Sequence, residues 1–340
     1  MRQQKPLEQQ VVVVVGASSG IGRATALRFA QRGAKVVVSA RSEPGLTSLV
    51  DEIRRGGGEA MAVAADAAEF DQLKDVADRA VATFGRLDTW VHLAAVALYA
   101  PFEQTTPEEF KRVVEINLLG QVYGAMAALP HLKRQGSGAL IHISSVEARR
   151  AFPLQTAYAS AKHGIDGFLE ALRVELRHEG LPITVTQILP GSINTPLFDK
   201  ARTTLGVKPM LPPPLYQPNT VADLILYAAE HPRREYIAGG GGQAMLLTQR
   251  LSPRLMDALT MRFGFQLQRT DEPKPEDAPH NLFAPIQGYD RIEGDFSTIS
   301  TPRSLYNWLE THPALRRGVL AGAALGAVAG LAARSVMNRG

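Results

Sequence analysis

The sequence predicts an α/β fold with a doubly wound parallel sheet, because short apolar runs alternate with segments of helical periodicity. Several runs are apolar throughout, as are the valines 11–15, and this is typical of parallel strands covered on both faces. The expected strands are residues 11–15, 35–39, 60–64, 89–93, 139–144 and 183–189. The expected helices are residues 21–31, 46–54, 70–84, 107–134 and 156–179.

The composition excludes several classes of function. The 340 residues contain no cysteine, so disulfides, thiolate chemistry and cysteine-based metal sites are ruled out, and we predict no metal site. The net charge is only +4, and no basic stripe carries interleaved aromatic residues, so we expect no nucleic-acid partner. The polar N-terminus lacks the apolar core of a signal peptide, which favours a cytoplasmic protein.

The chain divides into three expected parts. Residues 8–245 form the α/β domain, and residues 246–312 form a C-terminal extension. The extension contains "TDEPKPEDAP", a run rich in proline and acidic residues that is typical of a linker or flexible loop. Residues 313–340 are rich in alanine and glycine, and we expect them to form an apolar tail helix.

The glycine-rich stretch after the five valines is the first candidate binding site. Gly16 would let the chain turn sharply, Gly20 would let the backbone approach a pyrophosphate, and Gly22 would let the next helix pack close to the strand. Free N–H groups at the start of that helix would face the phosphates, and the residues concerned are Ser18, Ser19, Gly20 and Ile21. A glycine-rich turn without a ligand is the alternative.

A second group of residues carries acid–base chemistry. Tyr158 and Lys162 are four residues apart, so they share one face of the expected helix. An ammonium beside a phenol lowers the pKa of the tyrosine and makes it a usable acid. Ser145 follows a strand at its carboxyl end, where open α/β sheets bind ligands, and its hydroxyl could hold a carbonyl oxygen.

Together these motifs resemble the short-chain dehydrogenase/reductase family over about residues 10–242. The matching stretches are "GASSGIG" (16–22), "AAD" ending at Asp66, "EIN" ending at Asn117, "ISS" ending at Ser145, "YASAK" (158–162) and "PGSINT" (190–195). The resemblance implies a Rossmann-like fold and an NAD(P)(H)-dependent oxidoreductase that interconverts an alcohol and a ketone or aldehyde. A cofactor-binding sensor or scaffold without turnover is the alternative.

The resemblance also implies a role for individual residues. Tyr158 is the catalytic acid/base, Lys162 lowers its pKa and holds the nicotinamide ribose, and Ser145 orients the substrate oxygen. Asn117 supports a water chain that links Lys162 to solvent and also counts among the cofactor-binding residues, as do Tyr158 and Lys162. The remaining cofactor contacts implied are Asp66 at the adenine, Ala94, and Pro190, Gly191, Ile193 and Thr195 at the nicotinamide carboxamide.

The sequence departs from the family pattern after the fourth strand. The family's N-N-A-G is replaced by "HLAA", residues 92–95, and the usual threonine before the first glycine is Val15. His92 could take over one hydrogen-bonding role, whereas Leu93 has no polar group. These changes concern the cofactor loop and leave the proton-transfer residues intact.

Arg41 indicates which cofactor is used. NAD-specific members carry an acidic residue at the end of the second strand, but this strand ends in Ser39, Ala40 and Arg41. A guanidinium pairs well with a phosphate, so we expect NADP(H) rather than NAD(H). An ordinary exposed loop arginine is the alternative.

The substrate and the assembly are less defined. Residues 198–216 contain "KPMLPPPLY" and suggest either an apolar lid over an apolar alcohol or carbonyl substrate, or a rigid surface loop. We expect Glu147, Arg149 and Phe152 near the mouth of the pocket, and Tyr99, Phe102 and Leu197 are further candidates for its lining. The family resemblance implies a homodimer or homotetramer formed through the helices that carry Asn117 and Tyr158.

The tail carries glycines at positions 318, 322, 326 and 330, which would all lie on one helical face. Arginines at 316, 317 and 334 flank the apolar run and could bind anionic head groups. Three interpretations stay open: membrane contact through residues 317–334, an oligomer contact, or a weakly ordered tail.

Overall fold

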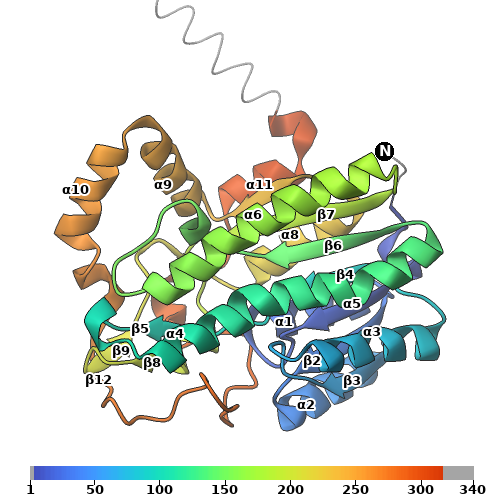
Figure 1. Cartoon of the computed structure of the whole chain (residues 1–340), viewed down its shortest axis with the longest axis horizontal. Helices are drawn as coiled ribbons and strands as arrows, with labels where there is room; N and C mark the ends of the chain where they lie inside the picture. Colours follow the sequence, from blue (N-terminus) through green and yellow to red (C-terminus); the bar gives the residue numbers. More distant parts are fainter. Residues whose placement is uncertain (1–3, 317–340) are drawn as a thin grey trace, which may run out of the picture.

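The computed structural model describes residues 4–316, which form a seven-stranded sheet with helices on both faces (Figure 1). The strand order is β11-β7-β6-β4-β1-β2-β3, and every pairing in this sheet is parallel. The strands are β1 (Val11–Val15), β2 (Lys35–Ala40), β3 (Ala60–Ala64), β4 (Thr89–His92), β6 (Gly138–Ile143), β7 (Ile183–Pro190) and β11 (Glu235–Ala238).

The valines of β1 show why this strand is apolar throughout. Val12 and Val14 point into the core on one face of the sheet, and Val13 and Val15 point into the core on the other. Both cores are covered by helices, so neither face of the strand meets water. On the first face lie α1 (Gly20–Gln31), α2 (Glu43–Arg55) and α8 (Asn219–Glu230); on the second lie α3 (Phe70–Phe84), α5 (Gly120–Gln135) and α6 (Thr156–His178).

The predicted doubly wound fold is therefore confirmed. The six expected strands and five expected helices are present with shifts of a few residues at their ends. The expected helix 107–134 consists of α4 (Pro107–Val114), a π-helical turn (Glu115–Leu119) and α5. The structure adds α8 and β11, which the sequence analysis did not identify.

The strand order reverses between β1 and β4, because the chain winds from β1 to β3 in one direction and from β4 to β11 in the other. At such a switch point the loops at the carboxyl ends of the two strands separate and leave a crevice. The glycine-rich turn follows β1 and the "HLAA" stretch begins within β4, so both lie at this crevice.

The extension packs onto the α/β domain. Its first helix, α9 (Gly240–Leu251), starts six residues before the expected boundary, and we count the whole of α9 as part of the extension. α10 (Pro253–Phe263) follows, and α11 (Leu305–Thr311) is the last helix. Between them β12 (Arg269–Pro273) pairs with β9 (Val207–Pro209), and β13 (Ser300–Thr301) pairs with β10 (Leu215–Tyr216). The linker prediction, made for residues 270–279, is therefore wrong for residues 270–273. After β12 the orange-red chain runs along the lower edge of the molecule (Figure 1).

Among the described residues, one helix, Pro107–Gln135, is long and apolar enough to cross a membrane, and half of its most apolar window is buried within the protein. This is the segment that packs against the sheet, and burial of that kind is typical of a core helix. The apolar tail predicted at residues 317–334 lies outside the described residues.

Candidate active site

The glycine-rich turn is shaped by close backbone contacts. Gly16 has φ +87°, and a Cβ added to it would lie 2.5 Å from the Ala94 nitrogen. A Cβ on Gly22 would lie 2.1 Å from the Gly16 oxygen. Gly16 is thus required because the turn packs against the loop after β4, and Gly22 because the turn packs against its own first residue. This conformation places the start of α1 at the crevice.

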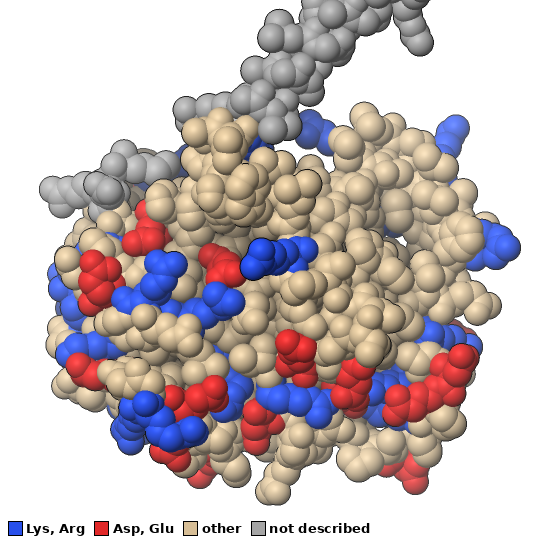
Figure 2. Space-filling model, turned by 180° about the vertical axis from the view of Figure 1, so that it is seen from behind, with Lys and Arg blue, Asp and Glu red and all other residues tan. Residues whose placement is uncertain are grey.

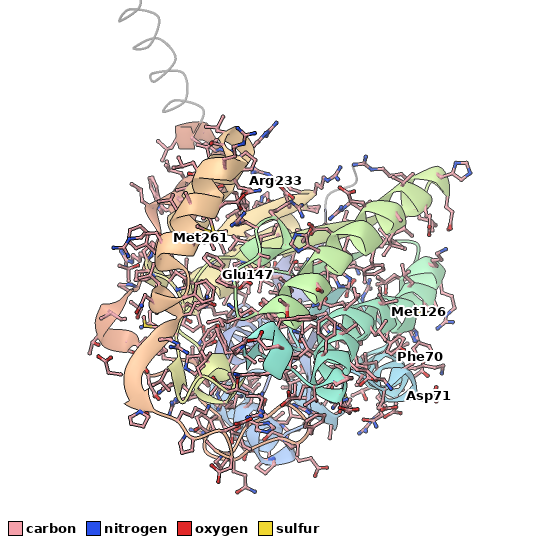
Figure 3. The ribbon with its side chains drawn as sticks, turned by 60° about the vertical axis from the view of Figure 1, so that its left-hand side comes forward. Phe70, Asp71, Met126, Glu147, Arg233 and Met261 are labelled. Atoms are coloured by element: carbon pink, nitrogen blue, oxygen red, sulfur yellow. The ribbon has the colours of Figure 1, made fainter. Side chains whose placement is uncertain are left out.

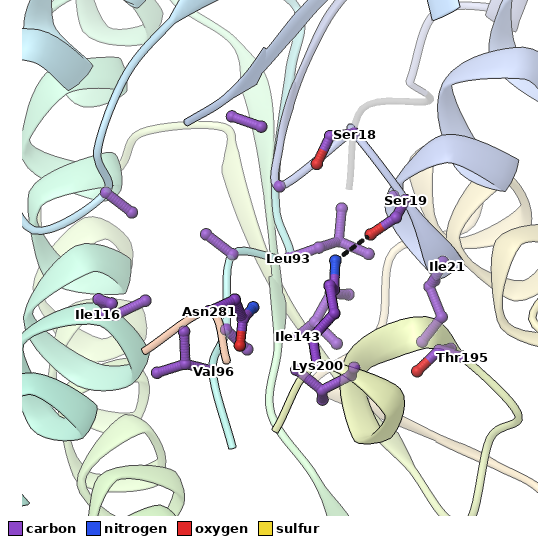
Figure 4. A pocket seen from close by; sticks show the side chains of 18 of the residues that line it. Ser18, Ser19, Ile21, Leu93, Val96, Ile116, Ile143, Thr195, Lys200 and Asn281 are labelled. Carbon is purple, nitrogen blue, oxygen red and sulfur yellow. Dashed lines mark hydrogen bonds between the residues drawn. The ribbon is translucent and has the colours of Figure 1, made fainter. Parts of the chain in front are cut away.

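The start of α1 presents a polar, cationic environment. Ser19 is the N-cap residue but makes no side-chain cap; its hydroxyl instead accepts a hydrogen bond from Lys200 Nζ at 2.9 Å (Figure 4). Burial lowers the pKa of Lys200 to about 8, while nearby Asp290 acts to raise it. The sequence analysis missed Lys200, because no motif links the end of α7 (Pro196–Asp199) to the glycine-rich turn.

Tyr158, Lys162 and Ser145 converge at the carboxyl end of β6. Tyr158 and Lys162 lie on consecutive turns of α6, and Lys162 Nζ is 5.3 Å from the centre of the Tyr158 ring. The buried ammonium donates to the Ile143 carbonyl at 3.0 Å. Ser145 is buried, caps a short 3-10 turn and accepts a hydrogen bond from the Glu147 N–H.

Burial dominates the ionisation of this group. It raises the pKa of Tyr158, the Glu147 carboxyl adds to the rise, and the Ser145 hydroxyl opposes it. Burial lowers the pKa of Lys162 to about 7, against the raising effect of Glu147. The lowered tyrosine pKa that the sequence predicts is therefore not found, because desolvation of the phenolate outweighs any help from the ammonium.

Glu147 is a buried carboxyl beside this group. It is 4% exposed, and Figure 3 shows it in the interior of the molecule rather than at the mouth where we expected it. Burial raises its pKa to about 8, while Lys162 and hydrogen bonds from Phe152 and Gln155 lower it. Its Oε2 has no hydrogen-bond partner among the described residues.

Asn117 lies in the π-helical turn between α4 and α5. Its side chain accepts from the Val96 N–H at 2.8 Å and donates to the Val96 carbonyl at 2.9 Å, so it pins the loop after β4. A π-helical turn inside an α-helix is frequent at functional sites, because it shifts the backbone groups around it. Asn117 is fully buried and does not line the cleft; its predicted place in a water chain stays a prediction.

The "HLAA" departure has a packing explanation. His92 is fully buried, its ring nitrogens have no hydrogen-bond partner among the described residues, and burial lowers its pKa well below the usual value. The predicted hydrogen-bonding replacement is therefore not found. Gly124 makes room for the ring, since a Cβ there would lie 2.4 Å from His92 Nδ1.

Arg41 and Asp66 lie at the other end of the cleft, and both are already engaged. Arg41 donates to the carbonyls of Asn281 at 2.6 Å and Phe283 at 3.2 Å, which belong to the extension. The alternative of a free loop arginine is therefore wrong. Asp66 forms an ion pair with Arg112 and accepts from the Ala68 N–H at 3.0 Å.

One cleft brings the predicted site residues together. With the exception of Asn117, every predicted catalytic and cofactor-binding residue lines it: Gly16, Ser18, Ser19, Gly20, Ile21, Gly22, Arg41, Asp66, Ala94, Ser145, Tyr158, Lys162, Pro190, Gly191, Ile193 and Thr195. The extension contributes four further lining residues that sequence reasoning missed: Asn281, Pro285, Ile286 and Asp290.

A second, apolar cavity of 270 Å³ adjoins the first at Gly191. Its wall combines Val146, next to Ser145, with side chains of the extension; these include Met245, Met256, Leu259 and Phe263. Of the pocket residues predicted from sequence, Phe152 lines this cavity and Leu197 lines the cleft. Tyr99 and Phe102 line neither cavity, because Tyr99 is buried in the core and Phe102 is 67% exposed.

A parallel sheet that opens onto a glycine-rich turn and a Ser-Tyr-Lys group defines a nucleotide-binding α/β oxidoreductase. The family model described as short chain dehydrogenase matches residues 10–206, and the chain belongs to this family. It is 38% identical to the uncharacterized oxidoreductase YxnA of Bacillus subtilis over 94% of this chain and 90% of that protein.

Other similar proteins match a smaller share of this chain. A 3-oxoacyl-[acyl-carrier-protein] reductase of Synechocystis is 35% identical over 68% of this chain and 94% of that protein. A short chain dehydrogenase/reductase from Burkholderia phymatum, solved in complex with NAD, has a TM-score of 0.67 at 22% identity and covers 79% of this chain and 99% of that one. This likeness confirms the fold.

Proposed function

We propose that the protein is an NAD(P)(H)-dependent oxidoreductase that interconverts an alcohol and a ketone or aldehyde. The observation that carries the proposal is the convergence of Tyr158, Ser145 and Lys162 in the same cleft as the glycine-rich turn. The relatives named as 3-oxoacyl reductases support a carbonyl substrate.

The residues of the cleft fit a dinucleotide. The turn presents the start of α1, Lys200 supplies a half-buried cation beside Ser19, and the buried Asn281 Oδ1 has no partner among the described residues. Phosphates would be held by Lys200 and by the N–H groups at the start of α1 other than that of Gly20, which donates to the Arg291 carbonyl. The carboxamide would be held by Ile193 and Thr195. When bound, the cofactor supplies or accepts the hydride.

The chain's own residues handle the proton and the charge. During reduction, negative charge develops on the substrate oxygen, where the hydroxyls of Ser145 and Tyr158 stabilise it by hydrogen bonding. Tyr158 then gives its proton to that oxygen. The raised pKa keeps Tyr158 protonated for this step, and the Lys162 ammonium stabilises the phenolate left behind.

Arg41 supports a preference for NADP(H). The extension carbonyls use its Nη1 and Nη2, and its Nε makes no hydrogen bond in the described part of the chain, so donor capacity remains for a 2′-phosphate. We expect Arg41→Ala to weaken NADPH binding about tenfold and to leave NADH binding nearly unchanged. Fluorescence titration of both cofactors measures the ratio; equal losses would point to a structural role for Arg41.

The substrate we propose is apolar, because the cavity beside Ser145 is lined by methionine, leucine, proline and phenylalanine side chains. Oligomerisation as a homodimer or homotetramer and membrane contact through residues 317–334 stay predictions.

NADPH and NADH oxidation over a panel of apolar ketones, aldehydes and quinones tests the proposal. We expect Tyr158→Phe to lower turnover by about 10²–10⁴-fold while cofactor binding is kept, since only the proton donor is removed. Tyr123→Phe is the matched control, because Tyr123 lies on α5 and packs edge-on against Phe70. Tight cofactor binding without turnover of any compound would favour the sensor or scaffold instead.

A further inference from the structure

A segment of the extension, residues 281–294, crosses the mouth of the cleft; we call it the strap. At its first end the Asn281 and Phe283 carbonyls accept from Arg41, and the Leu282 carbonyl accepts from Arg112 Nε at 3.3 Å. At its last end the Gly294 N–H donates to the Asn194 carbonyl at 3.2 Å. The strap thus spans the cleft from the predicted adenosine end to the predicted nicotinamide end.

Both ends of the strap are anchored. Leu282 is fully buried in an apolar cluster with Val96 and Ile116. The Arg291 side chain pairs with Asp199 at 3.1 Å and with Asp295 at 2.6 Å, and Asp295 also pairs with Lys208. Each anchor combines several contacts, so the ends are held more firmly than a single surface ion pair would allow.

Among the described residues, the middle of the strap, residues 284–290, lacks the hydrogen bonds that hold its two ends. Within the part of the chain that the structure describes, no hydrogen bond ties residues 284–290 to the rest of the protein. Gly288, with φ +84°, lies in this stretch. Pro285, Ile286 and Asp290 nevertheless line the cleft. The middle still contacts the site, since Lys200 Nζ lies 6.0 Å from the centre of the Tyr289 ring. A segment with anchored ends and a middle without hydrogen bonds can move without unfolding its anchors.

The strap engages residues of the binding site itself. The Gly20 N–H, at the start of α1, donates to the Arg291 carbonyl at 2.9 Å. The Asn281 N–H donates to the carbonyl of Lys200, whose ammonium reaches Ser19. The position of the strap is therefore coupled to the groups that would hold the phosphates.

The environment of the Asn281 side chain indicates a ligand-binding position. Its side chain is 7% exposed and lines the cleft beside Val96 and Ile116, and its Oδ1 has no hydrogen-bond partner among the described residues (Figure 4). A buried amide oxygen without a partner costs free energy, and a donor on a bound molecule would remove that cost. A ribose hydroxyl or an adenine amino group has the required chemistry.

We infer that the strap closes over the bound dinucleotide, that Asn281 contacts the adenosine half of it, and that cofactor exchange requires the strap to open. The inference rests on the proposed function, since it assumes that the cleft binds NAD(P)(H). A strap that filled the site would leave no room for a ligand, whereas the cleft that it lines together with the glycine-rich turn and Tyr158 encloses a cavity of 190 Å³.

A reversible crosslink tests this directly. The Asp290 Cγ lies 2.9 Å from the position of a Cβ on Gly45, so the Cβ atoms of the Gly45→Cys/Asp290→Cys variant would be within the roughly 4.5 Å that a disulfide spans. The chain has no cysteine of its own, so oxidation can form only this intramolecular bond within one chain. The reduced variant is its own control for folding and for the effect of the substitutions.

Binding is followed by the fluorescence of NADPH, with NADH in parallel, and needs no substrate. When the double-cysteine variant is oxidised before NADPH is added, we expect NADPH association to slow at least about tenfold. When the variant is loaded with NADPH and then oxidised, we expect it to retain the NADPH that the reduced variant releases. Equal rates in both states would overturn the inference, and so would a disulfide that forms only without NADPH. Failure of the unmodified protein to bind either cofactor would overturn the proposed function as well.

A second variant does not depend on the crosslink. Arg291→Ala removes the side chain that anchors the last end of the strap, and we expect NADPH to dissociate about tenfold faster. Arg254→Ala is the matched control, because Arg254 is exposed on α10 away from the strap. A lower Kd for NADPH in Arg291→Ala would mean that the strap competes with the cofactor, which contradicts closure over it.

Discussion

The α/β domain and the extension contribute to the same cleft in different ways. The domain supplies the residues to which we assign the chemistry: Tyr158 and Lys162 lie on α6, and Ser145 follows β6, and both elements are packed in the core. The extension supplies a wall, and it combines a firmly buried inner side with an outer side on which Leu251 is 76% and Met261 79% exposed (Figure 3). A reaction centre needs rigid elements, whereas a covering segment needs anchors and a movable part.

The extension also contacts the segment before α6, the helix that carries Tyr158 and Lys162. Gln268, fully buried, accepts a hydrogen bond from Gln155 at 2.7 Å and donates to the Pro153 carbonyl at 3.0 Å. Gln155 is the residue before α6 and hydrogen-bonds Glu147. The two regions are therefore one folding unit around the cleft, and changes on the inner side of the extension should be felt in the site.

The α/β domain and the outer side of the extension differ in the kind of side chains that they expose to solvent. Seen from behind, lysine and arginine side chains alternate with aspartate and glutamate side chains over the lower part of the molecule (Figure 2). Mixed charges of this kind keep a surface solvated. α9 and α10, by contrast, expose the apolar residues Leu247, Leu251, Leu255, Leu259, Met261 and Phe263.

The largest expected effect contrasts the two sides of the extension. Leu282→Ala removes a fully buried side chain and should lower the free energy of unfolding by about 2–5 kcal/mol. Leu251→Ala, its matched control at 76% exposure, should change that free energy by less than about 0.5 kcal/mol. Urea unfolding measures both. Equal losses would contradict the distinction between an anchored inner side and a solvated outer side.

The next effect concerns Lys200, where domain and extension meet. Lys200→Met should weaken NADPH binding by about 10–100-fold, because a buried charge-assisted contact to phosphate is lost. Since the pKa of Lys200 is lowered to about 8, the unmodified protein should bind NADPH less tightly as pH rises through that value. Titrations across pH check this; the variant should show a flatter profile, and an identical profile would exclude Lys200 from the site.

A smaller effect tests the electrostatics of the domain alone. Glu147 raises the pKa of Lys162, so Glu147→Gln should lower it further. Because reduction is favoured by a protonated Lys162, the fall of kcat/KM with rising pH should move to lower pH by up to about one unit. Measuring the pH profile of carbonyl reduction decides this; a shift to higher pH would mean that Lys162 is not the titrating group.

The sequence predicted the parts of the fold that depend on local patterns. The valines of β1 and the glycines after them are readable because strand burial and turn geometry act over a few residues. The α8 and β11 elements were missed, and β11 joins the sheet only by pairing with β7. Lys200 and Asn281 could not be identified because their roles come from tertiary contacts; the Arg41–Asn281 hydrogen bond, for example, spans 240 residues.

The pKa values of the site residues also depend on tertiary contacts that the sequence does not reveal. The spacing of Tyr158 and Lys162 correctly placed both on one helical face, but the direction of the Tyr158 pKa shift depends on how deeply the hydroxyl is buried and on Glu147. Neither can be read from spacing. Burial of the whole group emerges only when β6, α6 and the extension are assembled.

The central claim is that this cleft transfers a hydride to a carbonyl carbon with Tyr158 as the proton donor. The most direct measurement uses NADPH deuterated at its hydride-donating carbon, with mass spectrometry of the alcohols formed from the carbonyl panel. The account predicts deuterium on the carbinol carbon with the unmodified protein and with Tyr123→Phe, and almost none with Tyr158→Phe. A protein that binds NADPH but forms no deuterated alcohol from any compound, or a Tyr158→Phe variant that transfers deuterium at the original rate, would contradict it.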